Sequence, residues 1–454
     1  MTTAVPAEND PATSLDVAVV GAGISGLAAA WLLAKRHRVT LYEADARLGG
    51  HSHTVDVAVR GTPVAVDTGF IVYNEPAYPN LTALFAHLGV ATQASEMSFA
   101  VSLDGGALEY SGSDLRGLFA QRGNLVNLRF WSMLRDLVRF YRNAPLDAAR
   151  AGLQPLDDYL DEKGYGRAFR EDHLYPMAAA IWSTPASRIG RYPTEAFVRF
   201  CENHGLLTLS DRPAWRTVTG GSREYVKKLA AALGDGVRMS RAALAVRRDE
   251  RGVSIKTGDG ERRHDHVVIA CHADQALRLL PEASNAERAL LGAFAYSRNL
   301  AVLHSDPALM PRRRAVWSSW NYGADRGRPE ALSVTYWMNR LQGIDERLPL
   351  FLTLNPSREP RSDLLHRTEV YEHPLFDAAA IRAQDELWSL QGHRRTWFCG
   401  AYFGAGFHED GLQAGLAVAE ALGGVRRPWT VAGESARIRL HGALAAAAPA
   451  SVSA

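Results

Sequence analysis

Residues 16–45 read DVAVVGAGISGLAAAWLLAKRHRVTLYEAD, and this stretch determines the fold. It starts with a short run of β-branched and apolar residues, continues through a glycine-rich turn into an Ala/Leu-rich segment, and ends in a second short apolar run at 39–42. The runs are typical of strands and the Ala/Leu segment is typical of a helix. The order strand, helix, strand predicts a βαβ unit with parallel strands, and therefore an α/β fold.

The glycines of this unit predict a nucleotide site. Gly21, Gly23 and Gly26 form a GxGxxG motif directly after a strand and at the start of a helix, which is the context the motif requires. The first glycine permits a tight turn, the second lets pyrophosphate approach the backbone, and the third allows close packing of helix on strand. Glu43 ends the second strand at the place of a ribose ligand, so a 2′-phosphate, and with it NADP, is disfavoured.

A second motif follows at once. Arg47-Leu48-Gly49-Gly50 comes just after Glu43, and the pattern E-x-x-x-R-x-G-G resembles the dinucleotide-binding start of the amine oxidase and phytoene desaturase flavoprotein superfamily. In that superfamily the arginine and the two glycines lie against the adenosine and pyrophosphate. The resemblance implies that the cofactor is FAD.

Distant segments match the same superfamily. Val246 and the run DHVVIA at 265–270 resemble the strands near the adenine, and CGAYFGAGFHEDGLQAGLAVAEAL at 399–422 resembles the closing strand, turn and helix beside the flavin. Ala401 departs from the pattern, because the superfamily usually has an acidic residue there. The resemblance covers residues 15–425.

The resemblance implies a Rossmann-type, glutathione-reductase-like FAD-binding domain with an interleaved α+β substrate domain and a helical cap. We expect the FAD-binding domain to comprise 15–75, 215–285 and 390–425, the substrate and cap domain 76–214 and 286–389, and flexible tails 1–14 and 443–454. The candidate cofactor-binding residues are Gly21, Gly23, Ser25, Gly26, Glu43, Ala44, Arg47, Gly49, Gly50, His51, Gly69, Phe70, Val246, Ala270, Gly400, Ala401, Gly411, Leu412 and Gln413.

Composition limits the other possibilities. A net charge of +2 argues against nucleic acid as an obligatory partner. Three cysteines far apart indicate neither a disulfide framework nor a zinc site, and they fit a reducing, cytoplasmic compartment. The pair His51 and His53 has metal-ligand spacing but no third ligand, so we expect no metal. No secretory signal and no membrane span is evident.

Residues 77–210 are expected to be mostly helical, and 290–360 to be rich in strands and aromatic residues. The segment LVNLRFWSMLRDLVRFYR at 125–142 is amphipathic and basic, with Leu134, Leu137, Val138 and Tyr141 on one face and Arg135, Arg139 and Arg142 on another. Two interpretations are open. The segment either contacts an anionic membrane, at the inner membrane surface, or is an ordinary surface helix of the cap.

A closer resemblance is to bacterial predicted NAD/FAD-binding oxidoreductases associated with cyclopropane-fatty-acid-synthase-like enzymes. The runs GGHSHTV, VDTGFIVYN, TVTGGSREYV and WSSWNY carry it. Genes for such methyltransferases commonly lie beside those of that family. This association implies a lipid acyl substrate and a methyltransferase partner.

Lysine usage bears on the reaction. Many amine oxidases of the superfamily place a lysine, through water, at the flavin N5, within the strand that follows the V-V-x-A strand. Here no lysine follows Lys256, and the corresponding stretch, 296–300, reads YSRNL. We therefore expect hydride transfer from an unsaturated or methyl-branched fatty acyl chain, giving desaturation or isomerisation. A flavin amine oxidase, and a non-catalytic FAD-binding partner of a lipid-modifying methyltransferase, are the alternatives.

The candidate catalytic residues are His51, Tyr402 and His408, which the resemblance places in loops facing the flavin. Each of the last two has a structural alternative, since His408 also suits a helix cap and Tyr402 a core position. Gly69 and Phe70 either pass the edge of the isoalloxazine or form a plain β-turn. Aromatic residues that line an apolar substrate slot, or simply fill the core, are Trp182, Trp317, Trp320 and Tyr322.

Overall fold

The computed structural model describes residues 14–182, 186–209, 212–327 and 332–440. These residues form two compact units, each assembled from separate stretches of chain. Unit 1 comprises the described residues of Met1–Gly50, Tyr225–Ala293 and Ala383–Ala454, and unit 2 those of His51–Glu224 and Phe294–Arg382. The chain therefore leaves unit 1 twice and returns to it twice.

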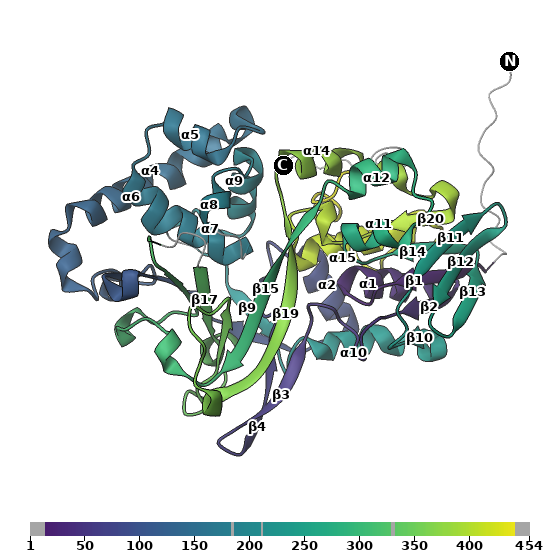
Figure 1. Ribbon diagram of the computed structural model, residues 1–454, viewed down its shortest axis with the longest axis horizontal. Coiled ribbons are helices and arrows are strands. Elements are labelled where there is room, and N and C mark those ends of the chain that lie inside the picture. Colours follow the sequence, from purple (N-terminus) through teal and green to yellow (C-terminus); the bar gives the residue numbers. More distant parts are fainter. Residues whose placement is uncertain (1–13, 183–185, 210–211, 328–331, 441–454) are drawn as a thin grey trace. The chain divides into compact units, whose positions relative to one another are not determined.

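Among the described residues, unit 1 is built around a five-stranded parallel sheet with the order β10-β2-β1-β14-β20 (Figure 1). The strands are β1 Asp16–Val20, β2 Arg38–Tyr42, β10 Val237–Arg238, β14 His266–Ile269 and β20 Thr396–Phe398. The apolar residues of β1 and β14 are almost fully buried, as expected where both faces of a parallel sheet are covered. Here α1 Ile24–Leu33 packs on β1 and β14, and the strands β12 Gly252–Thr257 and β13 Gly260–His264 also contact them. The predicted βαβ unit is confirmed.

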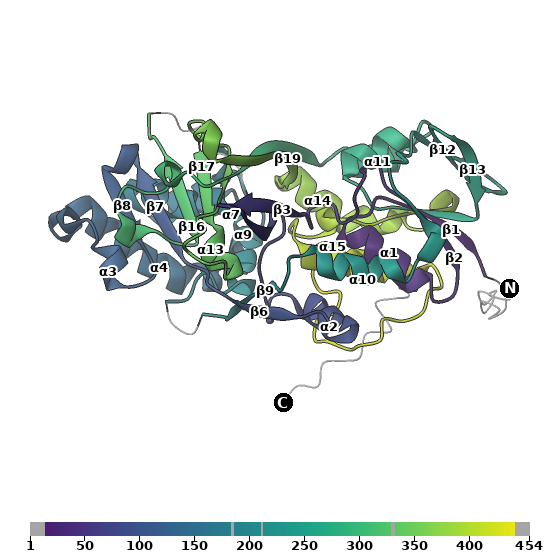
Figure 2. The same cartoon turned by 90° about the horizontal axis from the view of Figure 1, so that it is seen from below.

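Two helices of unit 1, α1 and α15, pack side by side (Figure 2). A Cβ on Gly415 would lie 2.2 Å from the Ser25 carbonyl oxygen, so a side chain there would separate them. The helix α15 begins at His408. The helices of this unit are α1 Ile24–Leu33, α11 Ala273–Leu279, α12 Asn285–Leu291 and α15 His408–Ala421, and the unit boundaries fall within α10 Arg223–Ala231 and α14 Ala378–Glu386.

Unit 1 also holds a small antiparallel sheet. It consists of β11 Ala245–Asp249, β12 Gly252–Thr257 and β13 Gly260–His264. The turn at 258–260 joins β12 to β13. Val246 faces Ile255 in the register and is buried.

Within the described part of unit 2, a seven-stranded sheet has the order β19-β15-β18-β17-β16-β7-β8. All neighbouring strands are antiparallel except β7 and β16. The predicted strand-rich region at 290–360 supplies β15 to β18. The strands are β7 Phe99–Leu103, β8 Leu108–Ser111, β15 Ala295–His304, β16 Trp320–Ala324, β17 Leu332–Trp337, β18 Phe351–Leu354 and β19 Leu365–Leu375.

Shorter strands complete unit 2. A hairpin around Gly61 is formed by β3 Thr54–Val59 and β4 Thr62–Asp67, while β5 Tyr73–Asn74 and β6 Thr92–Ser95 flank β9 Trp215–Val218. The described residues of 77–210 are mostly helical, as expected, and they also contain the strands β6, β7 and β8. The strand β6 pairs with β9 and β7 pairs with β16, both far along the chain, while β8 pairs with β7; such tertiary pairing overrides local propensity.

The helices of unit 2 are α2 Pro79–Leu88, α3 Leu115–Leu118, α4 Leu128–Ala151, α5 Leu156–Glu162, α6 Arg167–Phe169, α7 Tyr175–Trp182, α8 Ala186–Ile189, α9 Thr194–Asn203 and α13 Met338–Gln342. Along α4, Leu137 and Tyr141 are buried, and Arg139 donates to the carbonyls of Lys163 and Gly164. This part of α4 is a cap helix, as one of the two interpretations expected. No helix within the described residues is long and apolar enough to cross a membrane.

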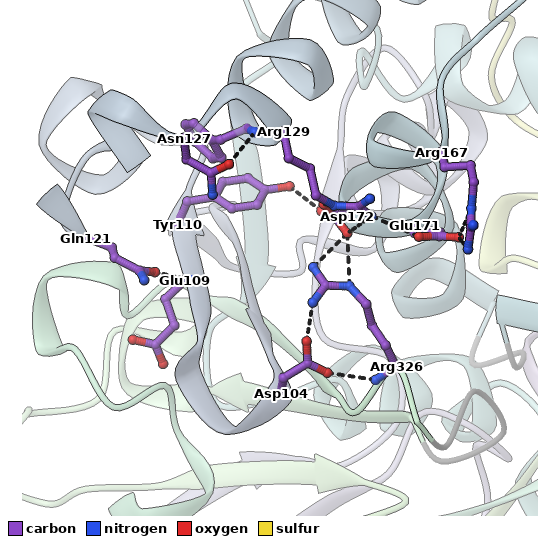
Figure 3. A network of polar contacts seen from close by, with 11 residues as sticks. Asp104, Glu109, Tyr110, Gln121, Asn127, Arg129, Arg167, Glu171, Asp172 and Arg326 are labelled. Atoms are coloured by element: carbon purple, nitrogen blue, oxygen red, sulfur yellow. Dashed lines mark hydrogen bonds and ion pairs between the residues drawn. The ribbon is translucent and has the colours of Figure 1, made fainter. Parts of the chain in front are cut away.

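A polar network joins the helices of unit 2 to its sheet (Figure 3). Asp172, on the π-helical turn Arg170–Leu174, is buried and accepts from Arg129 of α4 at 2.8 Å and from Arg326 at 2.8 Å. Arg326 also pairs with Asp104, beside β7. Tyr110 of β8 donates to the Asp172 carbonyl at 2.7 Å. One buried carboxylate thus connects α4, the π-helical turn and the sheet.

The units differ from the predicted domains at four places. Residues 51–75 and 215–224 were expected in the FAD-binding domain but belong to unit 2, and residues 286–293 and 383–389 were expected in the substrate and cap domain but belong to unit 1. The cause of the first two differences is local pairing, since β5 and β9 share one small sheet, and Asp67 and Ser222 are joined by hydrogen bonds. The predicted tails, 1–14 and 443–454, lie outside the described residues, apart from Ser14.

Candidate cofactor and active site

The turn after β1 has the shape that a phosphate-binding glycine loop requires. Gly21 has a φ of +102°, and a Cβ there would lie 2.8 Å from the Ala270 carbonyl oxygen. Its N–H donates to the Tyr42 carbonyl at 2.8 Å, which ties the turn to β2. At Gly23, by contrast, a Cβ would meet nothing within 4 Å. Open space therefore lies beside the second glycine, where pyrophosphate is predicted to approach.

Gly23 is also the N-cap of α1 and provides no side-chain cap. The first turn of an α-helix carries amide donors and the positive end of the helix dipole, so this uncapped end suits a phosphate. The first turns of α1 and α15 are in contact, because a Cβ on Gly411 would lie 2.7 Å from Ser25 Oγ. Two helix N-termini therefore converge on one place, and their dipoles act together on an anion there.

Glu43 is held at the end of β2. Its Oε2 accepts the Ala22 N–H at 2.8 Å, and its Oε1 accepts the Asp45 N–H at 2.9 Å. A carboxylate has about four acceptor positions, so two backbone bonds orient Glu43 and leave capacity for ribose hydroxyls. The geometry fits the role predicted for this residue.

The second glycine motif folds over the first. Gly49 donates its N–H to the Ala22 carbonyl at 2.8 Å, and Arg47 Nη1 donates to the Gly50 carbonyl at 2.8 Å. Gly50 has a φ of +56°, and a Cβ there would lie 3.1 Å from Gly23 Cα. The two motifs quoted from the sequence therefore form one cradle.

The loop before α15 is fixed by a residue that the motifs did not indicate. Gln384 Nε2 donates to the carbonyls of Tyr402 and Gly404 at 2.9 and 2.6 Å. Tyr402 is buried with its ring 5.0 Å from that of Phe403. This position corresponds to the core alternative for Tyr402. Gln384 comes from α14, and no local pattern marks it.

His408 is buried at the start of α15, and its Nε2 lies 3.0 Å from Tyr225 Oη in a hydrogen bond. Burial lowers the pKa of His408 to about 3, so its ring is neutral at physiological pH. This favours the structural alternative over proton handling. Tyr225, like Gln384, was not indicated by the sequence motifs.

The other predicted cofactor residues of unit 1 are distributed around this cradle. The Ala270 N–H donates to the Val20 carbonyl at 2.8 Å, at the end of β14. Leu412 and Gln413 are buried on α15, where Gln413 Nε2 donates to Glu409 at 3.0 Å. The remaining candidates lie in the same loops, with Ala44 exposed after Glu43 and Gly400 and Ala401 directly after β20.

The candidates of unit 2 form a separate cluster. The Phe70 N–H donates to the His51 carbonyl at 2.7 Å, and a Cβ on Gly69 would lie 2.1 Å from that carbonyl oxygen. The His51 ring is 5.1 Å from Tyr371 and 5.4 Å from His373, both on β19. The sequence motifs did not indicate these two aromatic residues, because their partners are more than 300 positions earlier in the chain.

The two histidines of the HxH pair contact the same tyrosine, His51 through its ring and His53 through a hydrogen bond. His53 Nδ1 lies 3.0 Å from Tyr371 Oη, and Thr68 Oγ1 lies 2.6 Å from the same oxygen. Over the described residues, no group of three or more His, Cys, Asp or Glu is arranged to hold a metal ion. Tyr371 therefore links the strand that follows His53 to the TGF turn.

Asp67, in the VDTGF run, is fully buried and strongly hydrogen-bonded. It accepts from Ser222 Oγ at 2.7 Å, Thr54 Oγ1 at 2.6 Å and Gln342 Nε2 at 2.9 Å. The Ser222 N–H adds a bond at 2.9 Å. The VDTGF and TGGS runs are thus brought together by one carboxylate. Burial raises the pKa of Asp67 to about 6, although its hydrogen bonds oppose the shift.

This raised pKa predicts a pH-dependent stability. The folded state holds the Asp67 proton more tightly than the unfolded state, so its contribution is present at low pH and is lost as pH rises through about 6. Between pH 7 and pH 5 the free energy of unfolding of the wild type should increase by about 1.4 kcal/mol relative to Asp67→Asn. Urea unfolding of both proteins at the two pH values measures this difference. An equal pH response of both would contradict it.

The sequence profile of one family, described as flavin containing amine oxidoreductase, matches residues 24–423. The chain belongs to this family. As a family member it is an FAD-dependent oxidoreductase, and the FAD predicted from the two glycine motifs is confirmed. The cradle fits this cofactor, because open space adjoins Gly23 between two helix N-termini and an oriented carboxylate.

The curated relatives of this FAD-dependent oxidoreductase are distant in sequence. It is 25% identical over 376 residues to "Putative flavin-containing monoamine oxidase AofH" of Mycobacterium tuberculosis, covering 79% of this chain and 74% of that protein. It is 22% identical over 276 residues to an L-amino acid dehydrogenase of Synechocystis, and this match covers 57% of this chain and 56% of that protein.

Solved structures share its fold. Putrescine oxidase bound to putrescine superposes with a TM-score of 0.65 at 17% identity, over 90% of this chain and 99% of that one. A CLA-producing fatty acid isomerase from P. acnes superposes with a TM-score of 0.65 at 14% identity, over 92% of this chain and 99% of that one. At these identities the likeness shows the amine oxidase type of FAD-binding fold.

Proposed function

We propose that this FAD-dependent oxidoreductase desaturates or isomerises an unsaturated or methyl-branched fatty acyl chain. Bound FAD supplies a hydride acceptor at its N5 atom. The chain's own residues must then hold the reacting carbons in place and exclude water. The observation that carries the proposal is that the seven-stranded sheet of unit 2, as the structure describes it, contains no lysine.

All five lysines of the chain lie within the described residues, and Lys163 alone belongs to unit 2. It follows α5, and its Nζ lies 3.2 Å from Asp147. No lysine lies on the seven strands from β7 to β19 that form the large sheet. The lysine-and-water arrangement of many amine oxidases has no counterpart on these strands, and hydride transfer from a carbon chain does not need one.

The buried carboxylates of unit 2 give independent support. Those that the structure describes are all engaged by protein donors: Asp67 by Ser222, Glu109 by Arg313, Asp136 by the Gly166 N–H, Asp172 by Arg129, and Asp306 by the Ala308 N–H. A buried carboxylate that is already paired has little capacity to bind the ammonium group of an amine substrate. An uncharged acyl chain does not need a carboxylate as a binding partner.

Neutral aromatic residues of β16 and β17 also favour an apolar substrate. The Trp320 ring packs edge-on to Tyr336 at 4.9 Å. Burial raises the pKa of Tyr322 to about 12 and raises that of Tyr336 further, so both phenols stay uncharged. The CLA-producing isomerase of P. acnes shows that a chain of this fold serves a fatty acid substrate.

Amine oxidation is the second candidate. The family description, the monoamine oxidase relative and the fold shared with putrescine oxidase favour it equally. A non-catalytic role beside a lipid-modifying methyltransferase is the third.

Anaerobic flavin reduction separates these candidates. The holoenzyme is mixed under argon with phospholipids that carry oleoyl, linoleoyl or methyl-branched chains and, separately, with primary amines and polyamines. We expect the acyl substrates, and none of the amines, to bleach the oxidised flavin band or to yield a shifted double bond by mass spectrometry. Bleaching by amines alone would overturn the proposal. No reaction with either class would favour the non-catalytic role.

The same experiment distinguishes the two acyl reactions. Desaturation removes a hydride and a proton from adjacent carbons, so without an external electron acceptor it stops after one turnover per FAD. Isomerisation returns the hydride to the chain, so it continues without an acceptor. The ratio of product to FAD after anaerobic incubation therefore reports which reaction occurs.

A further inference from the structure

Unit 2 carries a cluster of large apolar side chains that no other part of the described chain covers. It lies on α3, on the turn Arg122–Val126 and on the start of α4. We call it the apolar tip. Its members and their exposed fractions are Leu115 74%, Leu125 53%, Val126 84%, Leu128 86% and Trp131 46%. Scattered exposed leucines need no explanation, but five within 17 residues indicate an interaction surface.

The tip is a defined structure. Trp131 Nε1 donates to the Leu125 carbonyl at 2.9 Å, and the Trp131 ring lies 5.7 Å from that of Phe119, at the end of α3. Asn127 caps α4 by accepting the Phe130 N–H at 3.2 Å. The buried Asn124 donates to the Glu109 carbonyl on β8 at 3.1 Å. The apolar side chains are thus presented on a backbone that is anchored to the sheet.

Positive charge predominates at the tip. Residues 114–135 contain Arg116, Arg122, Arg129 and Arg135 and one acidic residue, the exposed Asp114 that caps α3. Arg129 is committed to the Asp172 network, whereas the side chains of Arg116, Arg122 and Arg135 are exposed. A basic surface next to exposed Leu, Val and Trp complements an anionic lipid interface, which offers negative headgroups above an apolar layer.

We propose that the apolar tip docks this protein on an anionic phospholipid membrane, with Val126 and Leu128 entering the acyl layer and Trp131 at the level of the headgroups. The indole N–H of Trp131 already donates to the Leu125 carbonyl, so the ring can enter the interface without an unpaired hydrogen-bond donor. This surface differs from the helical stripe recognised in the sequence. Leu137 and Tyr141 of that stripe are buried within unit 2.

Vesicle flotation tests the docking. Holoenzyme is mixed with vesicles of phosphatidylglycerol and phosphatidylcholine in equal parts, and with vesicles of phosphatidylcholine alone. We expect binding to the anionic vesicles that weakens with salt. In V126D/L128D the affinity for these vesicles should fall about 100-fold, because each inserted large apolar side chain contributes a factor of about ten to the membrane partition coefficient. The matched control is L244D/L365D, which places the same charges at other exposed leucines and should bind as wild type.

Depth-dependent quenching tests the place of Trp131. Brominated phosphatidylcholine in the anionic vesicles should quench part of the tryptophan fluorescence, and Trp131→Phe should remove that quenching while leaving flotation within a few-fold of wild type. Equal flotation of V126D/L128D and wild type, or no flotation of a flavin-loaded wild type, would overturn the proposal. Self-association in sedimentation velocity that V126D/L128D abolishes, without vesicle binding, would assign the tip to a second copy instead.

The docking does not rest on the proposed substrate. A protein that binds anionic vesicles and is bleached only by amines would retain the docking surface and lose the acyl substrate. Bleaching by soluble acyl chains without vesicle binding would give the reverse result. Flavin absorbance of each variant, measured before flotation, shows that the variants are folded.

Discussion

Alanine at Gly26 is expected to prevent stable folding of unit 1 and with it the retention of FAD. The added Cβ would lie 1.9 Å from the Gly21 carbonyl oxygen and 3.0 Å from Ala270 Cβ. Neither the β1 turn nor β14 has room to move, because both are buried in the parallel sheet. We expect a loss of more than about 3 kcal/mol in the free energy of unfolding. Thermal unfolding followed by circular dichroism, with flavin absorbance after purification, measures both effects.

Gly23→Ala provides the matched control, since it adds the same methyl group to the same loop. Gly23 has φ −71° and ψ 179°, which alanine adopts, and its Cβ would meet no atom of the chain. The protein should therefore fold with nearly normal stability. The methyl occupies the space predicted for pyrophosphate, so FAD should bind about 10- to 100-fold more weakly. Tight FAD binding by Gly23→Ala, or a stable flavin-loaded Gly26→Ala, would refute the placement of the cofactor.

Removal of the buried carboxylate in Asp172→Ala is expected to destabilise unit 2 by about 3 kcal/mol. Arg129 and Arg326 would be left facing each other without their shared partner, which lies 2.8 Å from each. Hydrogen bonds to Asp172 also raise the pKa of Arg129, so this guanidinium stays charged and would keep only Glu171, to which it donates at 2.8 Å. Chemical denaturation of the holoenzyme measures the loss.

The exposed ion pair of Arg199 and Glu195 on α9 is the comparison for this effect. These side chains form an i,i+4 pair with an exposed arginine, so Arg199→Ala should cost less than about 0.5 kcal/mol. Similar losses for Asp172→Ala and Arg199→Ala would show that the network in Figure 3 does not join the α4 region to the sheet in the way we describe.

The βαβ unit could be predicted because its elements are adjacent in the sequence. Strand, glycine turn and helix each have a local pattern, and β1 pairs with β2 over its whole length. The strands β6, β7 and β8 could not be predicted, since they are short and gain their stability from β9 and β16. The domain boundaries differed for the same reason, because the pairing of β5 with β9 draws 215–224 into unit 2.

The cofactor site was predicted further than the catalytic site. The glycines of these motifs lie where two backbone segments approach closely. A larger residue would place its Cβ within 2.2 Å of a carbonyl oxygen there, as Gly26 and Gly415 illustrate. Gln384, Tyr225 and Tyr371 act through a few side-chain contacts with residues far away in the sequence, for which many residue types are suitable. Their roles therefore left no pattern in the sequence, and the roles of His51 and Tyr402 stay predictions.

By itself the sequence determined that the chain contains a dinucleotide-binding βαβ unit, and its extended motif indicated FAD. A glycine is required wherever two backbone segments approach too closely for a Cβ atom, so the glycine positions of a short motif indicate such an approach without knowledge of the rest of the chain. Only the tertiary structure decided that His408 is neutral and bonded to Tyr225, that Asp67 joins two distant runs, and that Val126 and Leu128 stay exposed while Leu137 is covered. Burial and charge state depend on neighbours from the whole chain, and these neighbours exist only after folding.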